Sequence, residues 1–278
     1  MKIFNKISDL ITCLSQHGVS DSRIGFVPTM GSLHEGHITL IKKSLRENTT
    51  TVVSIFINPT QFNSSKDLET YPKNLNNDCS LLKTISENIL VFVPSVKEIY
   101  GNNMFTNSYD FNGLDKYMEG KFRNNHFDGV ATVVELLFNI VKPTSAYFGE
   151  KDFQQLKIIS TLNSNVKIIS CKTHRDKAGL AFSSRNKKLN SETTQIASNI
   201  FKNLCYIKSN FKNQSIKSLK KTVVDDINSF DQMDLEYLII ADDDKLVPTN
   251  AINFKKKYRA FISVFVDGIR LIDNIALN

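Results

Sequence analysis

Short, almost wholly apolar runs alternate with amphipathic segments along the first two thirds of this 278-residue chain. Runs rich in β-branched residues and nearly free of charge are typical of strands buried on both faces of a sheet. Such strands are expected at residues 23–28, 51–57, 89–93, 146–148 and 166–170. Apolar residues at helical spacing predict helices at residues 7–14 (ended by Gly18), 36–45, 74–85, 129–141 and 152–162. This alternation predicts an α/β fold, a parallel sheet with helices on both faces.

The first expected strand leads into a helix through the stretch 24–37, IGFVPTMGSLHEGH. Gly31 and Gly36 open the backbone there, and His34 and His37 lie three residues apart on one face of the helix entrance. Backbone N–H groups and the positive end of a helix dipole converge at such a junction and favour phosphate. The alternatives are two surface histidines or a zinc pair. Zinc would need a third protein ligand, and the sequence offers no acidic or thiol cluster as a candidate for it. We therefore interpret the stretch as a phosphate site.

Polar segments also follow other expected strands, at residues 58–62, 149–152 and 173–185. Ligands of parallel sheets bind beyond the carboxyl ends of the strands, so we expect these segments and residues 29–37 in one site. Asn58 and Gln61 offer neutral donors and acceptors to a small polar ligand, although Asn58-Pro59 is equally typical of a strand stop with an Asx-turn.

The stretch after the fourth expected strand carries several groups suited to a nucleotide. Gly149 lets the backbone approach a ligand closely, Lys151 can meet phosphate, and Asp152 can accept ribose hydroxyls or cap the following helix. Gln155, one turn later, faces the same way as Lys151 or Asp152. The loop 179–186, GLAFSSRN, suits a triphosphate or serves as an interdomain linker, and residues 123–129 are interpreted as a capping and positioning segment rather than a lid.

The pattern of expected strands and helices changes after about residue 186. Two lysine-decorated helices are expected within residues 191–230, and strands at residues 235–241, 258–266 and 269–272, with a hairpin turn at 266–269. We therefore expect a catalytic domain at residues 1–185 and a smaller α+β domain at residues 186–278.

The composition narrows the class of protein. The net charge of +7 comes from scattered lysines, which favours a solvated basic surface over nucleic-acid binding. The four cysteines are far apart and include no C-x-x-C pair, so reduced thiols in a cytoplasmic protein are expected. Neither a signal peptide nor a membrane-spanning run is found.

Several of these motifs, in this order, resemble the pantoate–β-alanine ligase family (the pantothenate synthetases). The motifs span nearly the whole chain: FVPTMG with H-x-G-H (26–37), SIFINPTQF (54–62), YP (71–72), HFDGVATVV (126–134), AYFGEKDFQQL (146–156), GLA with SSRN (179–186) and RLIDN (270–274). The family belongs to the H-x-G-H nucleotidyltransferases and has a Rossmann-like first domain and a small second domain. The resemblance also implies a homodimer.

The resemblance implies a two-step ligation. Pantoate attacks the α-phosphate of ATP, giving pantoyl adenylate and pyrophosphate, and the amine of β-alanine then displaces AMP to give pantothenate. Mg²⁺ is expected to accompany ATP, held largely by phosphates and water.

The resemblance also implies residue roles, and no metal-ligating side chain is expected. The residues expected to bind ATP are Met30, Gly31, His34, His37, Gly149, Glu150, Lys151, Asp152, Phe182, Ser183, Ser184 and Arg185. The catalytic residues would be His34, His37, Lys151 and Arg185, which supply fixed donors where charge builds on the phosphates, with His37 as proton donor. Asn58, Gln61 and Gln155 would bind pantoate or β-alanine.

Three places depart from the family pattern. Asn124-Asn125 stand where Pro-Gly is common, Asn63 stands where glycine usually follows Gln-Phe, and His174 replaces a small apolar residue. The alternative function is another H-x-G-H nucleotidyltransferase acting on a phosphorylated acceptor. Asn58 and Gln61 make this alternative less favoured, because neutral side chains are not the groups that seek phosphate. A basic RNA-binding protein would need clustered Lys and Arg with interleaved aromatics.

Overall fold

The computed structural model describes residues 1–16, 23–162 and 164–278, so Gly18, the expected end of the first helix, lies outside the described residues. The chain divides into two compact units. Unit 1 comprises Met1–Phe111, Arg123–Glu150 and Gln155–Lys172, and unit 2 comprises Asn112–Phe122, Lys151–Gln154 and Thr173–Asn278. This division places residues 173–185 and two earlier short segments in the second unit, unlike the expected boundary after residue 185.

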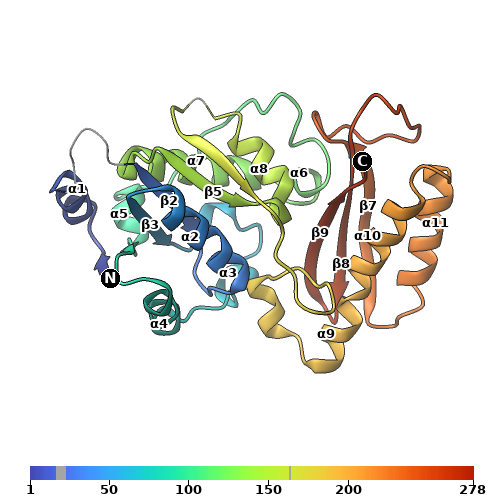
Figure 1. Cartoon of the computed structure of the whole chain (residues 1–278), viewed down its shortest axis with the longest axis horizontal. Coiled ribbons are helices and arrows are strands. Elements are labelled where there is room, and N and C mark those ends of the chain that lie inside the picture. Colours follow the sequence, from blue (N-terminus) through green and yellow to red (C-terminus); the bar gives the residue numbers. More distant parts are fainter. Residues whose placement is uncertain (17–22, 163) are drawn as a thin grey trace. The chain divides into compact units, whose positions relative to one another are not determined.

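Unit 1 contains a six-stranded parallel sheet with the order β1-β4-β3-β2-β5-β6 (Figure 1). The strands are β1 (Lys2–Phe4), β2 (Ile24–Thr29), β3 (Thr50–Ile55), β4 (Leu90–Phe92), β5 (Ser145–Gly149) and β6 (Lys167–Cys171). The predicted strands are confirmed with bounds shifted by one or two residues, whereas the short edge strand β1 was not expected. Without β1, the order β4-β3-β2-β5-β6 is the doubly wound 3-2-1-4-5 arrangement, whose switch point lies between β2 and β5.

Helices lie on both faces of this sheet. Ile41 of α2 (Glu35–Glu47) packs in one cluster with Val27 of β2, whereas Phe26 contacts Phe138 of α7 (His126–Val141) edge-on at 6.3 Å. Successive strand residues point to opposite faces, so α2 and α7 cover opposite sides of β2. Among the described residues up to 172, the other helices are α1 (Ile7–Gln16), α3 (Ser65–Glu69), α4 (Leu75–Ile85), α5 (Val96–Tyr100), α6 (Glu119–Phe122) and α8 (Phe153–Ile159).

The Tyr147 hydroxyl links β5 to the end of α2. It donates to Glu47 Oε2 at 2.9 Å and accepts from Asn48 Nδ2 at 2.7 Å. Burial, followed by the hydrogen bond and charge of Glu47, raises the pKa of Tyr147 to about 12.

Between about pH 10 and 12 the unfolded chain releases a proton that the folded chain keeps, so the free energy of unfolding falls as pH rises. Urea titrations should show a flatter pH dependence in this interval for Tyr147→Phe than for the parent chain, and equal slopes would contradict the assignment.

Unit 2 is built on a three-stranded antiparallel sheet, β7-β8-β9. Its strands are β7 (Met233–Asp242), β8 (Tyr258–Val266) and β9 (Ile269–Ala276), the last extending beyond the predicted 269–272. Asp267 and Gly268 have φ values of 47° and 73°, as the tight hairpin predicted there requires. Three helices, α9 (Ser191–Ala197), α10 (Asn199–Asn210) and α11 (Ile216–Ile227), replace the two predicted, because the helical run breaks at Ser198.

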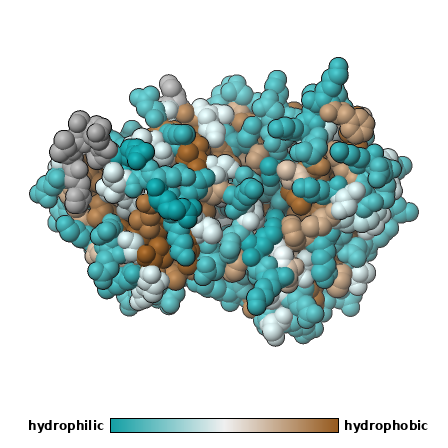
Figure 2. Space-filling view, in the orientation of Figure 1, coloured by the Kyte–Doolittle hydropathy of each residue, from teal (hydrophilic) through white to brown (hydrophobic). Residues whose placement is uncertain are grey.

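Hydrophilic side chains cover most of the face shown in Figure 2. Among the described residues, no helix has the length and apolarity needed to cross a bilayer.

Candidate active site

The junction between β2 and α2 places His34 and His37 together at the start of the helix. The two imidazole centroids are 4.0 Å apart, with 32° between the ring planes. The amides of His37 and Ile38 both donate to the His34 carbonyl, while the amides of Glu35 and Gly36 have no intrahelical acceptor because they open the helix. Paired imidazoles at a helix N-terminus are chemically suited to an anion, and this pair lies at the carboxyl end of β2, beside the switch point of the sheet.

The glycine-bearing turn itself donates its amides to the protein. The Gly31 amide donates to Thr29 Oγ1 at 3.2 Å, and the amides of Ser32 and Leu33 donate to the Asp78 carboxylate. The sequence pattern predicts that the backbone N–H groups of this stretch face an anion. Those of residues 31–33 donate to Thr29 and Asp78 instead, so this part of the expectation is wrong.

The segment after β3 holds Gln61 in place through Asn58. Asn58 Nδ2 donates to Gln61 Oε1 and to the Gly129 carbonyl, both at 3.1 Å. Its Oδ1 accepts from the Tyr100 hydroxyl at 2.6 Å and from the Thr60 amide, so Asn58 also caps η1 (Pro59–Gln61). The Asx-turn interpretation of Asn58 is therefore confirmed, and its amide donors are engaged within the protein. Gln61 Nε2 then lies 3.1 Å from Met30 Sδ, next to the histidine turn.

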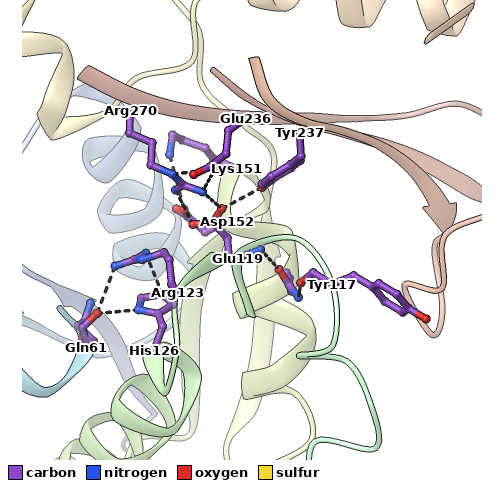
Figure 3. A network of polar contacts seen from close by, with 11 residues as sticks. Gln61, Tyr117, Glu119, Arg123, His126, Lys151, Asp152, Glu236, Tyr237 and Arg270 are labelled. Carbon is purple, nitrogen blue, oxygen red and sulfur yellow. Dashed lines mark hydrogen bonds and ion pairs between the residues drawn. The ribbon is translucent and has the colours of Figure 1, made fainter. Parts of the chain in front are cut away.

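Arg123 and His126 hold the backbone of Gln61 (Figure 3). The Gln61 carbonyl accepts from His126 Nδ1 at 2.8 Å and from Arg123 Nη2 at 3.2 Å, and Arg123 Nη1 lies 3.1 Å from His126 Nε2. A carbonyl only accepts and a guanidinium only donates, so His126 carries its proton on Nδ1 and accepts at Nε2. The positioning part of the interpretation of residues 123–129 therefore has a geometric basis.

The capping part of that interpretation is wrong at Asn125. This residue precedes α7 with a left-handed φ of 57°, and its side chain makes no capping hydrogen bond. The neighbouring Asn124 carbonyl instead accepts from Asn63 Nδ2. Two of the departures from the family pattern thus contact each other.

The residues after β5 and Gly149 are anchored within unit 2. Lys151 Nζ lies 3.5 Å from Asp152 Oδ1. The Lys151 carbonyl accepts from Asn274 Nδ2 at 2.8 Å, and Asn274 Oδ1 accepts from Arg259 Nη1 at 2.7 Å. The backbone at Lys151 is therefore fixed by β9, and its ammonium group is paired with the Asp152 carboxylate.

The segment 173–186 folds back on itself in unit 2. The rings of His174 and Phe182 stack at 5.2 Å, and the Phe182 amide donates to the His174 carbonyl at 3.1 Å. Ser183 Oγ accepts from the Arg185 amide at the start of η3 (Ser184–Lys188). Arg175 forms a two-armed ion pair with Asp273 of β9. The segment is therefore a structured part of unit 2 rather than a plain linker.

The predicted residues fall into two sets. Unit 1 carries Met30, Gly31, His34, His37, Asn58, Gln61, Gly149, Glu150 and Gln155, and unit 2 carries Lys151, Asp152, Phe182, Ser183, Ser184 and Arg185. The contacts of Asp78 with Ser32 and Leu33, and of Asn274 with Lys151, were not predicted. Asn274 at least lies in the RLIDN motif, whereas nothing local distinguishes Asp78. Within the described residues, no group of three or more His, Cys, Asp or Glu side chains could hold a metal ion.

Comparison with known proteins gives consistent matches over the full length. The family model described as pantoate-beta-alanine ligase matches residues 2–276. A pantothenate synthetase of Flavobacterium psychrophilum is 46% identical over 281 residues, covering 100% of both chains. The crystal structure of pantothenate synthetase from Thermus thermophilus superposes with a TM-score of 0.90 at 33% identity, covering 100% of this chain and 99% of that one. The pantoate-beta-alanine ligase of Francisella tularensis, complexed with beta-gamma ATP and beta-alanine, has a TM-score of 0.80 at 35% identity over 100% and 98% of the two chains.

Proposed function

The chain belongs to the pantoate–β-alanine ligase family, and on that premise we propose that it acts through a pantoyl-adenylate intermediate. It joins pantoate to β-alanine with ATP, forming pantothenate and releasing AMP and pyrophosphate. The observation that carries the proposed intermediate is the pair His34 and His37 at the N-terminus of α2 and the carboxyl end of β2. An adenylation step builds charge on phosphate oxygens, which is the charge that such fixed donors stabilise.

In the first step, a carboxylate oxygen of pantoate attacks the α-phosphorus of ATP, and the bond to pyrophosphate breaks. His34 and His37 donate to the phosphates, and His37 supplies the proton to the leaving pyrophosphate. Lys151 and Arg185 add positive charge, and Ser183 and Ser184 add hydroxyl donors. Met30, Gly31, Gly149, Glu150, Asp152 and Phe182 are proposed to bind the rest of ATP.

In the second step, the amine of β-alanine attacks the acyl carbon, AMP leaves, and the amine loses a proton. Gln61 and Gln155 are proposed to hold the acceptor through neutral amide groups. Asn58 acts through Gln61, because its amide donors and its oxygen already bind Gln61, Gly129 and Tyr100. Asn58 is accordingly a positioning residue in this proposal.

Mg²⁺ is proposed to accompany ATP and to neutralise phosphate charge. Mg²⁺ commonly keeps several waters and binds phosphate oxygens, so it fits a site whose described residues include no acidic cluster. EDTA should stop AMP formation, and added Mg²⁺ should restore it.

A homodimer and a cytoplasmic location are proposed as well. Four cysteines are free thiols, as a reducing compartment allows. Sedimentation should give about twice the chain mass of 31.5 kDa, and a mass of one chain would refute the dimer.

Product analysis tests the function directly. With ATP present, one AMP and one pyrophosphate should form for each pantothenate, and only when both pantoate and β-alanine are supplied. With pantoate alone and pyrophosphatase added, a single turnover should leave pantoyl adenylate on the protein. ATP turnover that ignores pantoate would refute the ligase, and transfer of a nucleotidyl group to a phosphorylated acceptor would favour the alternative transferase.

Gly129→Ala should weaken use of the acceptor substrates. An added Cβ would lie 2.5 Å from the Thr60 carbonyl oxygen and 2.7 Å from its carbon, so η1 must shift and Gln61 with it. We expect kcat/KM for β-alanine to fall roughly tenfold or more, because small displacements of a binding group are costly. Asn139→Ala, on an exposed position of α7, is the matched control. If Gly129→Ala only stabilised the helix, as alanine usually does, with unchanged kinetics, the argument would be wrong.

A further inference from the structure

A buried carboxylate from a distant helix closes the turn that precedes the paired histidines. Asp78 lies in the first turn of α4 and is 1% exposed. Its Oδ2 accepts from the Ser32 amide at 2.8 Å, and its Oδ1 accepts from the Leu33 amide at 2.7 Å. No ion pair among the described residues involves Asp78. Each of its two oxygens thus accepts a hydrogen bond from one of two successive backbone amides.

The turn needs such an acceptor because of its backbone conformation. Gly31 and Ser32 both have left-handed φ values, 77° and 52°. In a tight turn, successive backbone N–H groups can point to one side and together bind an anion such as a carboxylate. Ser32 is not a glycine, so its left-handed conformation is unfavourable unless the surrounding structure imposes it. A carboxylate with one oxygen for each amide meets that need.

The contact between Asp78 and the turn also fixes the backbone directly before His34. Leu33 is buried and directly precedes His34, the residue before α2. With Ser32 and Leu33 held by Asp78, and Gly31 held by Thr29 Oγ1, the chain enters α2 from an anchored point. The turn's own amides are thus engaged within the protein.

We propose that Asp78 is a positioning residue for adenylation, which holds the turn 31–33 so that His34 and His37 are placed for the phosphates of ATP. The inference rests on the proposed function of that histidine pair. The competing interpretation is that Asp78 contributes only to folding. The two differ in the kinetics of folded protein, because a purely structural residue changes how much protein is folded and not how each folded molecule reacts.

The test uses Asp78→Asn, which keeps the size of the side chain but replaces one acceptor with a donor. Asp226→Asn is the matched control, since Asp226 also accepts a hydrogen bond, from Asn203 Nδ2 at 2.7 Å, within unit 2. Single-turnover adenylation is measured on the full chain well below its melting temperature, per folded molecule. We expect the rate with Asp78→Asn to fall roughly 10- to 100-fold. The affinity for β-alanine and the Asp226→Asn rate should stay at parent values.

Hydrogen exchange on the parent chain gives a second measurement that does not depend on the variant folding. The amides of Ser32 and Leu33 should be protected with and without a non-hydrolysable ATP analogue, whereas those of Glu35 and Gly36 should gain protection only with it. Unprotected Ser32 and Leu33 amides, or parent-like adenylation by folded Asp78→Asn, would overturn the proposal. Absence of pantoate-dependent AMP formation in the parent chain would instead refute the proposed function, and the exchange data would still test the Asp78 contact.

Discussion

His37→Ala is expected to slow adenylation by about 10² to 10⁴-fold while leaving the fold intact. The imidazole lies in the first turn of α2, 4.0 Å from that of His34, and its removal takes away both a phosphate donor and the proposed proton donor. Its loss should leave the helix in place, because the buried contacts of α2 come from Ile38, Leu40, Ile41 and Ser44. The measurement is pantoate-dependent pyrophosphate release, with circular dichroism to confirm folding.

Two further variants sharpen this test. Lys42→Ala removes an exposed cation from the same helix and should keep the parent rate. His37→Asn retains a hydrogen-bond donor but cannot transfer a proton near neutral pH, so it should be about as slow as His37→Ala if proton donation is the main role. Near-normal pyrophosphate release by His37→Ala would show that the role assigned to His37 is wrong.

Arg270→Met is expected to destabilise the protein by about 3 kcal/mol, because it leaves two carboxylates without their cation. Arg270 of β9 donates from Nη1 to Oε2 of Glu119 in α6 at 2.8 Å, and from Nη2 to Oε1 of the same residue at 2.7 Å. It also donates from Nε and Nη2 to Oε2 of Glu236 in β7, at 3.0 Å and 2.5 Å (Figure 3). The Tyr237 hydroxyl also donates to Glu119, at 2.9 Å. Burial lowers the pKa of Arg270, but the hydrogen bonds and charges of Glu119 and Glu236 outweigh it, so its pKa is raised overall.

Urea unfolding followed by circular dichroism measures this loss. Lys257→Ala, which removes an exposed cation just before β8, should change the free energy of unfolding by less than about 0.5 kcal/mol. The triple variant Arg270→Met, Glu119→Gln, Glu236→Gln removes the unpaired charges as well and should recover part of the loss. If the triple variant is less stable than Arg270→Met, uncompensated charge is not the cause.

The secondary structure was largely predictable because buried strands and helices have local sequence patterns. The β-branched run that forms β3 and the apolar run that forms α7 can be recognised without any partner. The break at Ser198 between α9 and α10 could not, since both sides of it carry the same helical pattern. The short edge strand β1 is visible only as a partner of β4.

For the site, the chemical groups and their positions along the chain can be read directly from the order of the residues. His34 and His37 follow β2 at helical spacing, and Gln61 follows β3, so adjacency along the chain was enough to place them at strand ends. Membership of the family could likewise be inferred from motifs that are each local.

The contacts that hold those groups in place come from the packing of elements far apart in the chain. Asp78 reaches the Ser32 amide across 46 positions, His126 reaches the Gln61 carbonyl across 65, and Arg270 reaches Glu119 across 151. Hydrogen bonds of this kind depend on where separate elements pack, and a pattern of residue types along the chain carries no distance between elements. The candidate reacting residues could therefore be named from the sequence, whereas the contacts that hold them depend on how the separate elements pack.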